Sequence, residues 1–154
     1  MNSSILPEPL VATLSSATLP DALKAVIDHF DCQAGTYHRA EGSTLILAAS
    51  FQIPPAVVAL IQQVPIGKGI AGLAAERLEP VSLCNLQTDQ SGQARPAAKN
   101  TGMEGSLAVP ALDSKGVLLG VLGIAKAQAH DWTDDEKATV SKAAFLLATA
   151  SSQA

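Results

Sequence analysis

The segment 67–72 has the spacing G-x-G-x-x-G, and Asp89 follows 20 residues after Gly69. In a Rossmann fold such glycines bring a pyrophosphate to the N-terminus of a helix, and the acidic residue binds a ribose hydroxyl. That arrangement requires a strand directly before the first glycine. Residues 54–64 instead show the apolar spacing of a helix, and no parallel β-α-β unit follows. We therefore interpret the glycines as a tight turn between two helices.

The three histidines are far apart in the sequence and belong to different predicted elements. His29 ends a helix, His38 lies on a strand and His130 lies in a loop. The sequence has no H-E-x-x-H, C-x-x-C or G-x-S-x-G motif, which disfavours a zinc hydrolase and a serine nucleophile. We expect His29 and His130 to be partly exposed. The alternation of side chains along a strand places either His38 or Tyr37 on a covered face.

Two groups of charged residues could bind an ion or a ligand. Residues 134–136 are all acidic, but they follow Thr133 in the spacing T-x-x-E of a capping box. Negative charge in a first helical turn offsets the helix dipole, so we interpret this cluster as a helix start and expect no metal there. Arg95 and Lys99 are the only cations in the segment 85–104, where they could face an anionic ligand.

The composition limits the class of protein. The chain has 154 residues, of which 47% are hydrophobic and 16% charged, which suits one domain with its own core. Much of the apolar fraction is alanine, so the elements must pack closely through small side chains. The net charge is −4 and only 3% of the residues are aromatic. We therefore expect no nucleic-acid partner, since neither a basic surface nor a base-stacking platform is indicated.

The N-terminal sequence and the cysteines indicate a cytoplasmic protein without a membrane partner. Residues 1–20 contain no Lys or Arg and are interrupted by prolines, unlike a secretory signal. No apolar run approaches the roughly 20 residues that span a bilayer. Cys32 and Cys84 are the only thiols, and two widely spaced cysteines are typical of small buried residues in a reducing compartment.

Apolar periodicity and turn residues together predict an α+β fold. Apolar spacing predicts helices over 19–30 and 54–64. A short alanine-rich helix is expected over 70–77, after the glycine turn, and the capping box starts a closing helix over 133–151. Period-two alternation predicts strands over 32–40 and 44–51, and a brief strand is expected over 80–84. The segments 105–112 and 117–126 are expected to form a second hairpin around the turn at 113–116. This order gives hairpins with helices between them, which indicates an antiparallel sheet covered by helices. The segment 85–104 is polar and aperiodic, and a loop of that length is usually functional or mobile.

A series of short motifs follows in order between Ile66 and Phe145. The motifs are Ile70-Ala71-Gly72-Leu73-Ala74-Ala75, Pro80-Val81, Asn85-Leu86 with Asp89, Gly102 with Ser106-Leu107-Ala108-Val109-Pro110, Gly116-Val117-Leu118-Leu119-Gly120-Val121-Leu122, and Trp132-Thr133 with Asp135-Glu136. The ordered set resembles the GAF domain, a small-molecule-sensing module of phosphodiesterases, phytochromes and bacterial regulators. The resemblance implies a GAF-like antiparallel sheet of five to six strands covered by helices on both faces. It also implies an N-terminal extension over 1–14 and a single GAF domain over 15–154.

Members of this family hold a ligand between the sheet and the layer that corresponds to residues 54–104 here. Glycine turns and a long loop can leave a concavity over a sheet, and helix N-termini direct N–H donors into it. The resemblance implies the lining residues Tyr37, Ile70, Ala71, Asp89, Arg95, Met103 and Ser106. The few aromatic residues favour a small or polar ligand, and the cations of the segment 85–104 would suit an anionic one. Neither the motifs nor the resemblance identifies a cofactor.

Departures from the family's subclass motifs narrow the choice of ligand. Ala125 and Trp132 replace the Asn and Phe of the cyclic-nucleotide signature, and neither Cys32 nor Cys84 precedes the His typical of bilin attachment. In free methionine-(R)-sulfoxide reductases of this fold, cysteines occupy the position of Ala71 and a position near Lys99. That chemistry needs a thiolate and a second, resolving thiol.

Three functions remain as hypotheses. The first is a GAF sensor that binds a small cytoplasmic ligand, orders the 85–104 loop and signals through a partner protein. The second is a redox enzyme of the methionine sulfoxide type that uses Cys84. The third is a ligand-free scaffold that dimerises, because the apolar band of the closing helix is too wide for one covered face. We expect that helix and the helix 19–30 to form a homodimer interface.

Overall fold

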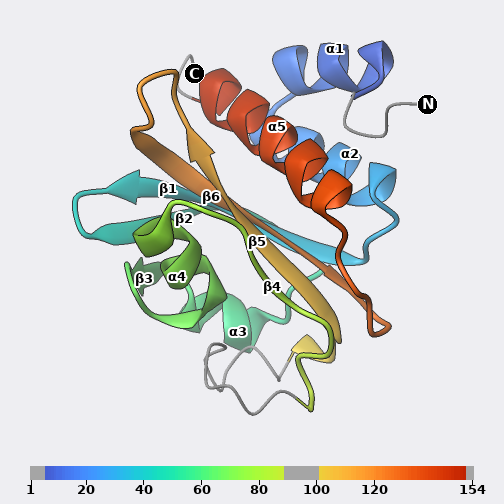
Figure 1. Ribbon diagram of the computed structural model, residues 1–154, viewed down its shortest axis with the longest axis vertical. Coiled ribbons are helices and arrows are strands. Elements are labelled where there is room, and N and C mark those ends of the chain that lie inside the picture. Colours follow the sequence, from blue (N-terminus) through green and yellow to red (C-terminus); the bar gives the residue numbers. More distant parts are fainter. Residues whose placement is uncertain (1–5, 89–100, 152–154) are drawn as a thin grey trace.

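The computed structural model describes residues 6–88 and 101–151. The helices in these ranges are α1 (Glu8–Ser16), α2 (Leu19–His29), α3 (Pro55–Leu60), α4 (Gly69–Arg77) and α5 (Asp134–Ser151). The strands are β1 (Ala34–Glu41), β2 (Thr44–Phe51), β3 (Gln63–Pro65), β4 (Val81–Leu83), β5 (Gly105–Leu112) and β6 (Leu118–Lys126) (Figure 1).

All of these strands belong to one antiparallel sheet with the order β3-β2-β1-β6-β5-β4. Two hairpins, β1–β2 and β5–β6, are joined at the centre, where Ala34–Arg39 of β1 pair with Gly120–Ala125 of β6. The short strands β3 and β4 extend the two hairpins at the outer edges. The architecture confirms the expected α+β class and the expected number of strands.

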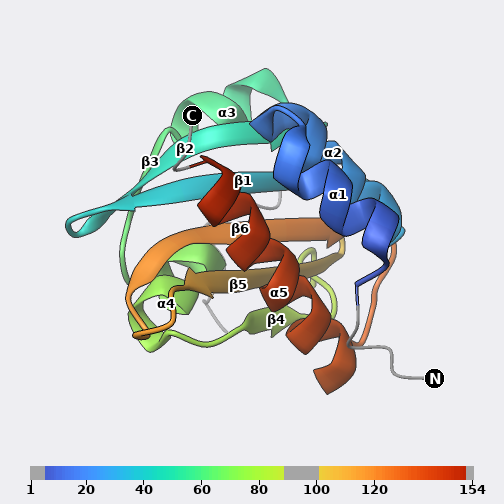
Figure 2. The ribbon, with the colours of Figure 1, turned by 90° about the horizontal axis from the view of Figure 1, so that it is seen from above.

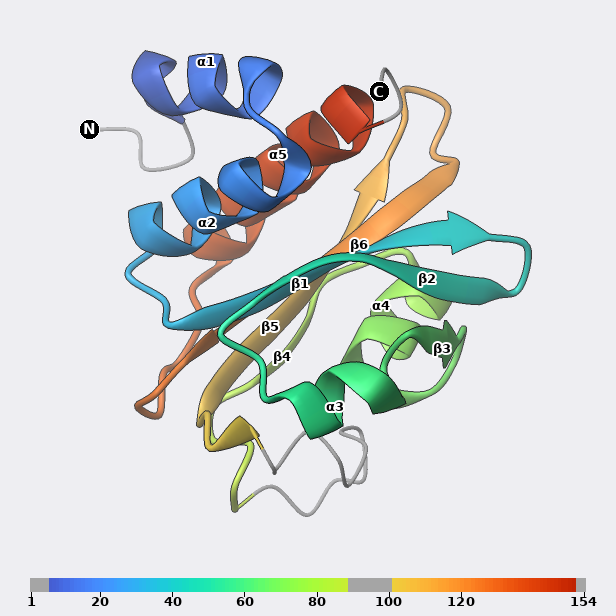
Figure 3. The ribbon, with the colours of Figure 1, turned by 180° about the vertical axis from the view of Figure 1, so that it is seen from behind.

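Helices cover both faces of this sheet, as expected. Helices α1, α2 and α5 lie on one face, which we call the three-helix face, and α3 and α4 lie on the other, the two-helix face (Figures 1 and 3). Figure 2 shows α5 crossing the strands with α1 and α2 beside it. The side chains on either face of the central strands are therefore covered, in accordance with the long apolar runs of β5 and β6.

A continuous hydrophobic core fills the three-helix face. Its largest fully buried side chains are Leu14, Leu23, Val26, Ile27, Tyr37, Leu107, Val109, Leu122, Ile124 and Leu147. Helix α5 contributes mostly small residues on this side, among them Ala143, Ala144 and Ala148. Small side chains let a helix lie close to a sheet, which explains why an alanine-rich helix is the one that crosses the strands.

Helix α1 belongs to the same core. Leu10 and Leu14 are buried, and the helix contacts both α2 and α5. The boundary expected between an extension at 1–14 and a domain at 15–154 therefore falls within a packed helix. The contact also explains the width of the apolar band on α5, because the sheet covers one side of that band and α1 and α2 cover another.

The segment expected as one helix over 54–64 divides into two elements. Helix α3 ends at Leu60, and Gln63–Pro65 pair with β2 as the edge strand β3. A short apolar run can suit either a helix or a strand, and here the open edge of β2 decides between them. The glycine turn thus follows a strand, and the prediction of a helix before it is wrong.

The turn at 67–72 has a structural reason for each glycine. Gly67 and Gly69 have φ angles of 99° and 70°, in the left-handed region that favours glycine. A Cβ on Gly72 would lie 2.6 Å from the carbonyl oxygen of Pro65, so only glycine allows this close approach. Because β3 pairs antiparallel with β2, the turn lacks the parallel β-α-β setting of a dinucleotide site.

Candidate ligand-binding cavity

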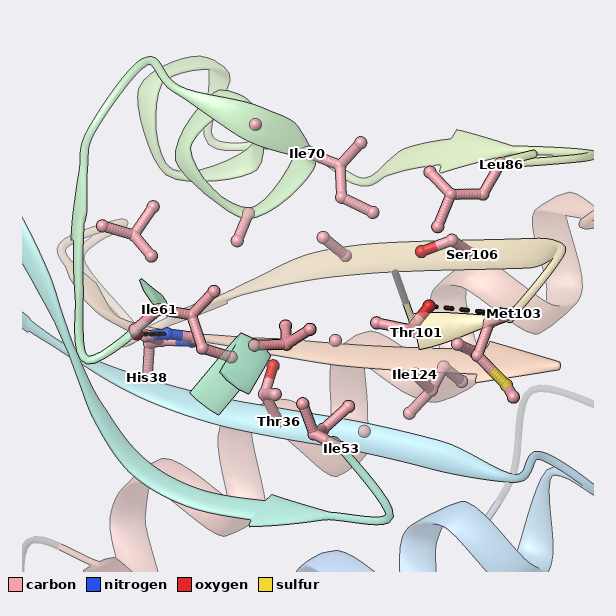
Figure 4. Close-up of a pocket in the computed structure, with 18 of the residues that line it drawn as sticks. Thr36, His38, Ile53, Ile61, Ile70, Leu86, Thr101, Met103, Ser106 and Ile124 are labelled. Carbon is pink, nitrogen blue, oxygen red and sulfur yellow. Dashed lines mark hydrogen bonds between the residues drawn. The ribbon is translucent and has the colours of Figure 1, made fainter. Parts of the chain in front are cut away.

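A cavity of about 150 Å³ lies between the sheet and the helices of the two-helix face. Residues of β1, β5 and β6 line one side of it, and residues of α3, α4 and the segment around Leu86 line the other. Figure 4 shows many of these side chains. The volume resembles that of an apolar cavity in another protein that binds benzene. The space therefore suits a small molecule or one end of a larger one.

Small residues on facing elements create this space. The sheet supplies Ala108 and Gly123 to the floor of the cavity, and α4 supplies Gly69 and Ala71 to its roof. A Cβ on Gly123 would lie 3.1 Å from Oγ1 of Thr36, so even one methyl group would crowd the floor. The core of the three-helix face is instead filled by larger side chains, among them Leu, Ile and Tyr.

The walls of the cavity are mainly apolar. Side chains from the segment before α3, from α3 and its end, from α4 and from the loop after β4 enclose it: Ile53, Val57, Ile61, Ile70 and Leu86. Such walls favour an apolar ligand body, while the few polar groups among them fix its orientation.

Main-chain and side-chain hydrogen bonds hold the rim at one end. The Leu86 N–H donates to the Glu104 carbonyl at 2.6 Å, and Nε2 of Gln87 donates to the Met103 carbonyl at 2.8 Å. Thr101 accepts a hydrogen bond from the Met103 N–H at 3.1 Å through its hydroxyl (Figure 4). These contacts position Met103 and Thr101 beside the cavity.

His38 is the buried titratable group of the cavity wall. It is 2% exposed, and its Nε2 lies 2.9 Å from the carbonyl oxygen of Ile61 (Figure 4). Burial lowers the pKa of His38 below its usual value, although the bond to Ile61 acts in the opposite direction. The ring is therefore neutral near pH 7. Because a carbonyl only accepts, Nε2 carries the proton and Nδ1 carries a lone pair.

A helix N-terminus also borders the cavity. Lys68 is the N-cap residue of α4 and provides no side-chain cap, and Lys68, Gly69, Ile70 and Ala71 all line the space. The first N–H groups of a helix have no acceptor within the helix, and they carry partial positive charge. With the Lys68 ammonium nearby, this end of the cavity suits an acceptor or anionic group of a ligand.

The expected site residues are only partly brought together. Ile70, Ala71, Met103 and Ser106 line the cavity. Asp89 and Arg95, with most of the 85–104 loop, lie outside the described residues. The structure corrects the expectation for Tyr37, which is 1% exposed and belongs to the core of the three-helix face.

Tyr37 and His38 are neighbours on β1 with different surroundings. Both are buried, but as neighbours on a strand they point to opposite faces of the sheet, and both faces are covered. The register between β1 and β2 shifts between them, with Tyr37 opposite Ala49 and His38 opposite Leu47. The extra residue, Ala48, lies on β2, and β1 alternates without a break against β6. Alternation alone therefore did not reveal which of the two side chains faces the cavity.

Other wall residues were not anticipated from the sequence. Thr36, His38, Ile53, Val57, Ile61 and Lys68 all line the cavity. The assignment of 54–64 to one helix hid the role of Ile61, since the carbonyl that meets His38 lies in the turn between α3 and β3. The alternation of side chains along β1 was the one signal in the sequence that could have placed His38 at the cavity.

The acidic cluster at 134–136 is the helix start that the sequence predicted. The Glu136 N–H donates to Oγ1 of Thr133 at 3.1 Å, and the Thr133 N–H donates to Oε1 of Glu136 at 2.8 Å. His130 adds a contact of 2.9 Å from Nε2 to Glu136. Within the described ranges, no cluster of His, Cys, Asp and Glu could hold a metal ion.

The two cysteines lie in different environments, and neither lines the cavity. Cys32 is buried in the core of the three-helix face, where burial raises the pKa of its thiol to about 11. Cys84 is exposed after β4. A thiol with so high a pKa is almost fully protonated at neutral pH, so Cys32 is a poor nucleophile.

The fold and the cavity define an α+β domain with a six-stranded antiparallel sheet and a ligand-sized space on one face. The family model described as the GAF domain matches residues 14–150. The chain belongs to the GAF domain family. No match was found among curated proteins. In residues 6–88 and 101–151, no helix is long and apolar enough to cross a membrane.

Solved structures share this fold at low sequence identity. One is the GAF domain of a phosphoenolpyruvate-protein phosphotransferase from Acinetobacter, with 19% identity, TM-score 0.74, and coverage of 94% of this chain and 89% of that one. The corresponding domain from Coxiella burnetii has 23% identity, TM-score 0.72, and coverage of 94% and 92%. Free methionine-R-sulfoxide reductase from Neisseria meningitidis, in complex with its substrate, has 16% identity, TM-score 0.73, and coverage of 94% and 86%.

Proposed function

We propose that this GAF domain is a cytoplasmic sensor that binds a small molecule in the cavity of the two-helix face and signals occupancy to a partner protein. The observation that carries the proposal is the cavity itself, about 150 Å³ in volume and lined by apolar walls with a few polar groups. A compact domain normally fills such a space, because each lost contact destabilises the fold. A space kept open by Gly123, Ala108 and Ala71 suits a ligand.

Occupancy of this site would affect elements that are lightly attached. Helix α3 spans only Pro55–Leu60, and of its residues only Val57 is buried. Segments with few buried contacts open most readily, and a ligand that contacts them stabilises one arrangement. A change in α3 and in the rim near Met103 would then alter the surface that a partner protein reads.

A thermal-shift screen tests this proposal directly. We would screen nucleotides, oxyanions, amino acids, tetrapyrroles and small apolar compounds, and we expect at least one to raise the melting temperature of the natural protein. Saturation at 100 times Kd would stabilise the fold by about 2.7 kcal/mol. If no compound raises the melting temperature and a crystal structure shows an empty cavity, the proposal is wrong.

Two matched variants localise the binding. Ala71→Leu adds a helix-compatible side chain to the wall of the cavity, so we expect the ligand-induced shift to disappear. Ala59→Leu makes the same change on the exposed surface of α3, and the shift should persist. Equal responses of the two variants to ligand would place the binding elsewhere.

The redox alternative would require a cysteine to reach a sulfoxide. Cys84 is exposed but is not part of the cavity wall, and Cys32 lies on the opposite face of the sheet. The decisive assay measures reduction of free methionine sulfoxide by the natural protein and by Cys84→Ser. Turnover in the natural protein that disappears in Cys84→Ser would show that the protein is a reductase that uses Cys84. The absence of turnover in the natural protein would show that this alternative is wrong.

The scaffold alternative concerns the outer surface of α2 and α5. The apolar band of α5 that motivated it is covered by the sheet, α1 and α2, although Phe145 on α5 remains 39% exposed. Light scattering at micromolar concentration tests the predicted homodimer, and a monomer would count against it.

A further inference from the structure

Two hydroxyl groups face the cavity from separate strands of its floor. Thr36 lies on β1 and Ser106 on β5, and both residues line the space. Figure 4 shows their hydroxyl oxygens directed into the cavity. In the part of the chain that the structure describes, neither hydroxyl has a hydrogen-bond partner. Ser106 is only 7% exposed, so its hydroxyl has little access to bulk water as a substitute.

The Thr36 hydroxyl borders open space rather than packed atoms. Among the described residues, a Cβ added to Gly123 would meet one atom within 4 Å beyond its chain neighbours, namely Oγ1 of Thr36 at 3.1 Å. This oxygen therefore lies beside the gap above Gly123, where a ligand can reach it. Neither hydroxyl oxygen is enclosed in the way that Nδ1 of His38 is, which lies below the surface of the wall.

The register of the sheet separates the two hydroxyls by a row of small residues. Thr36 pairs with Gly123 of β6, and Gly123 pairs in turn with Ala108 of β5. Ser106 lies two residues before Ala108, and so on the same face of the sheet. Two strand spacings in one direction and two residues in the other place the Cα atoms of Thr36 and Ser106 roughly 12 Å apart. A molecule the size of one ring fits between the two side chains.

The other polar side chains of the wall place weaker demands on a ligand. The Thr101 hydroxyl already accepts a hydrogen bond from the Met103 N–H. Lys68 is exposed and can turn toward solvent. A buried hydroxyl without a partner, in contrast, destabilises a fold by an amount similar to a lost hydrogen bond. Thr36 and Ser106 are therefore the groups that a ligand is expected to satisfy.

We propose that the ligand of this cavity is a neutral molecule with an apolar body and a hydrogen-bonding group at each end, one for Thr36 and one for Ser106. This inference rests on the proposed function and specifies the chemical class of the ligand. A hydroxyl both donates and accepts, so each end of the ligand can be an O–H group, a carbonyl or a ring nitrogen. Apolar walls exclude an isolated charge between the two ends, because transfer of an unpaired ion from water is strongly unfavourable.

Three para-substituted rings of similar size form a suitable set of probes. Hydroquinone has a hydroxyl at each end, p-cresol has one hydroxyl and one methyl group, and p-xylene has two methyl groups. The cavity volume of about 150 Å³ is comparable to that of a cavity that binds benzene, so one ring is a suitable body. Titrations followed by amide NMR shifts of the cavity residues give the Kd of each probe.

Thr36→Val and Ser106→Ala each remove one hydroxyl with little change in shape. We expect either variant to bind hydroquinone about fivefold or more weakly than the natural protein, because one ligand hydroxyl then loses its partner. Binding of p-xylene should change by less than about twofold. Thr44→Val is the matched control, since it makes the same replacement on β2 at a residue that does not line the cavity. It should leave all three Kd values unchanged.

The single hydroxyl of p-cresol gives a further signature of two partners. Because p-cresol can turn its hydroxyl toward whichever partner remains, each single variant should weaken its binding by no more than about twofold. The double variant leaves it no partner and should weaken its binding about fivefold or more. Loss of p-cresol binding in one single variant alone would show that only one of the two hydroxyls meets the ligand, and the inference would be wrong.

The outcomes separate this inference from the proposed function. If hydroquinone binding changes less than about twofold in either variant, or if p-xylene weakens equally, the inference is wrong and the cavity remains a ligand site. If p-xylene alone shifts the cavity amides, the hydroxyls do not pair with a ligand, and the inference is again wrong. If no probe affects these amides at millimolar concentration, the inference fails, whereas the thermal-shift screen decides the sensor proposal.

Discussion

The two faces of the sheet are both covered by helices but are packed differently. On the three-helix face, ten large side chains are fully buried and interlock with a long, alanine-rich α5. On the two-helix face, α3 and α4 are short, and glycines and alanines leave a cavity of about 150 Å³. The comparison indicates that the tightly packed three-helix face supplies the stability that allows the two-helix face to keep a cavity. Four predictions test this contrast, in order of decreasing effect.

The largest effect is expected from truncation on the three-helix face. Leu147 of α5 is fully buried, so Leu147→Ala should lower the free energy of unfolding by about 3 kcal/mol, within a usual range of roughly 2–5. Ile70→Ala removes a similar side chain that borders the cavity, and we expect a loss of less than about 1.5 kcal/mol because Ile70 is only partly buried. Urea denaturation measures both. Equal losses would contradict the contrast between the faces.

A pair of glycines provides a second comparison on neighbouring strands. A Cβ on Gly35 would lie 2.8 Å from Cδ1 of Ile27 and 2.7 Å from the Gly123 carbonyl, so Gly35→Ala should destabilise the fold by about 1–3 kcal/mol. A Cβ on Gly123 meets only Oγ1 of Thr36, at 3.1 Å, and it faces the cavity.

Gly123→Ala should accordingly change stability by less than about 1 kcal/mol, since alanine also loses less chain entropy on folding than glycine. The same substitution should weaken binding of any ligand in the cavity. Thermal unfolding with and without a compound found in the thermal-shift screen measures both effects, and a larger loss for Gly123→Ala than for Gly35→Ala would reverse the assignment of the two faces.

The third prediction concerns the pH dependence that His38 produces. Burial lowers the folded-state pKa of His38 below the ordinary value of 6.5, so the unfolded chain binds the proton first as the pH falls. Its contribution to stability is complete above about pH 7 and declines as the pH falls through 6.5 toward the folded-state pKa. The slope cannot exceed one proton, about 1.4 kcal/mol per pH unit.

His38→Gln should remove this slope, because glutamine does not titrate but can still donate to the Ile61 carbonyl. The measurement is chemical denaturation at several pH values between 5 and 8. An unchanged slope in the variant would show that His38 is protonated equally in the folded and unfolded chains.

The smallest effect compares the N-termini of two helices. Thr133→Ala removes the hydroxyl that accepts from the Glu136 N–H at the start of α5, which should destabilise the fold by about 1 kcal/mol. Lys68 at the start of α4 makes no such cap, and Lys68→Ala should have an effect within about 0.5 kcal/mol. Urea midpoints check both variants. A large loss of stability for Lys68→Ala would mean that the Lys68 side chain does stabilise the start of α4, and the contrast between the two helix N-termini would be wrong.

The sequence was sufficient for most of the secondary structure. Apolar periodicity located α2, β1 and β2, and turn residues located α4 and the hairpin of β5 and β6. The T-x-x-E spacing identified the capping box that begins α5 in the structure. These signals are local, because each depends on residues a few positions apart. The ordered motifs then placed the chain in its family, and the match over residues 14–150 confirmed that assignment.

The sequence was less informative about the site. It anticipated Ile70, Ala71, Met103 and Ser106 in the cavity wall but placed Tyr37 there as well. The error arose because alternation identifies which side chains share a face without identifying the face that carries the cavity. It also merged α3 and β3 into one helix, since the apolar run suited both structures until the edge of β2 was available for pairing.

The sequence by itself therefore determined the elements, the family and the small residues that a hollow face needs. Only the tertiary structure decided which small residues oppose one another across a space, because Gly123, Ala108 and Ala71 come from three separate elements. It also decided that His38 lines the cavity and that Nε2 of its ring donates a hydrogen bond to the Ile61 carbonyl. Both results depend on contacts between residues distant in the sequence, which local patterns do not encode.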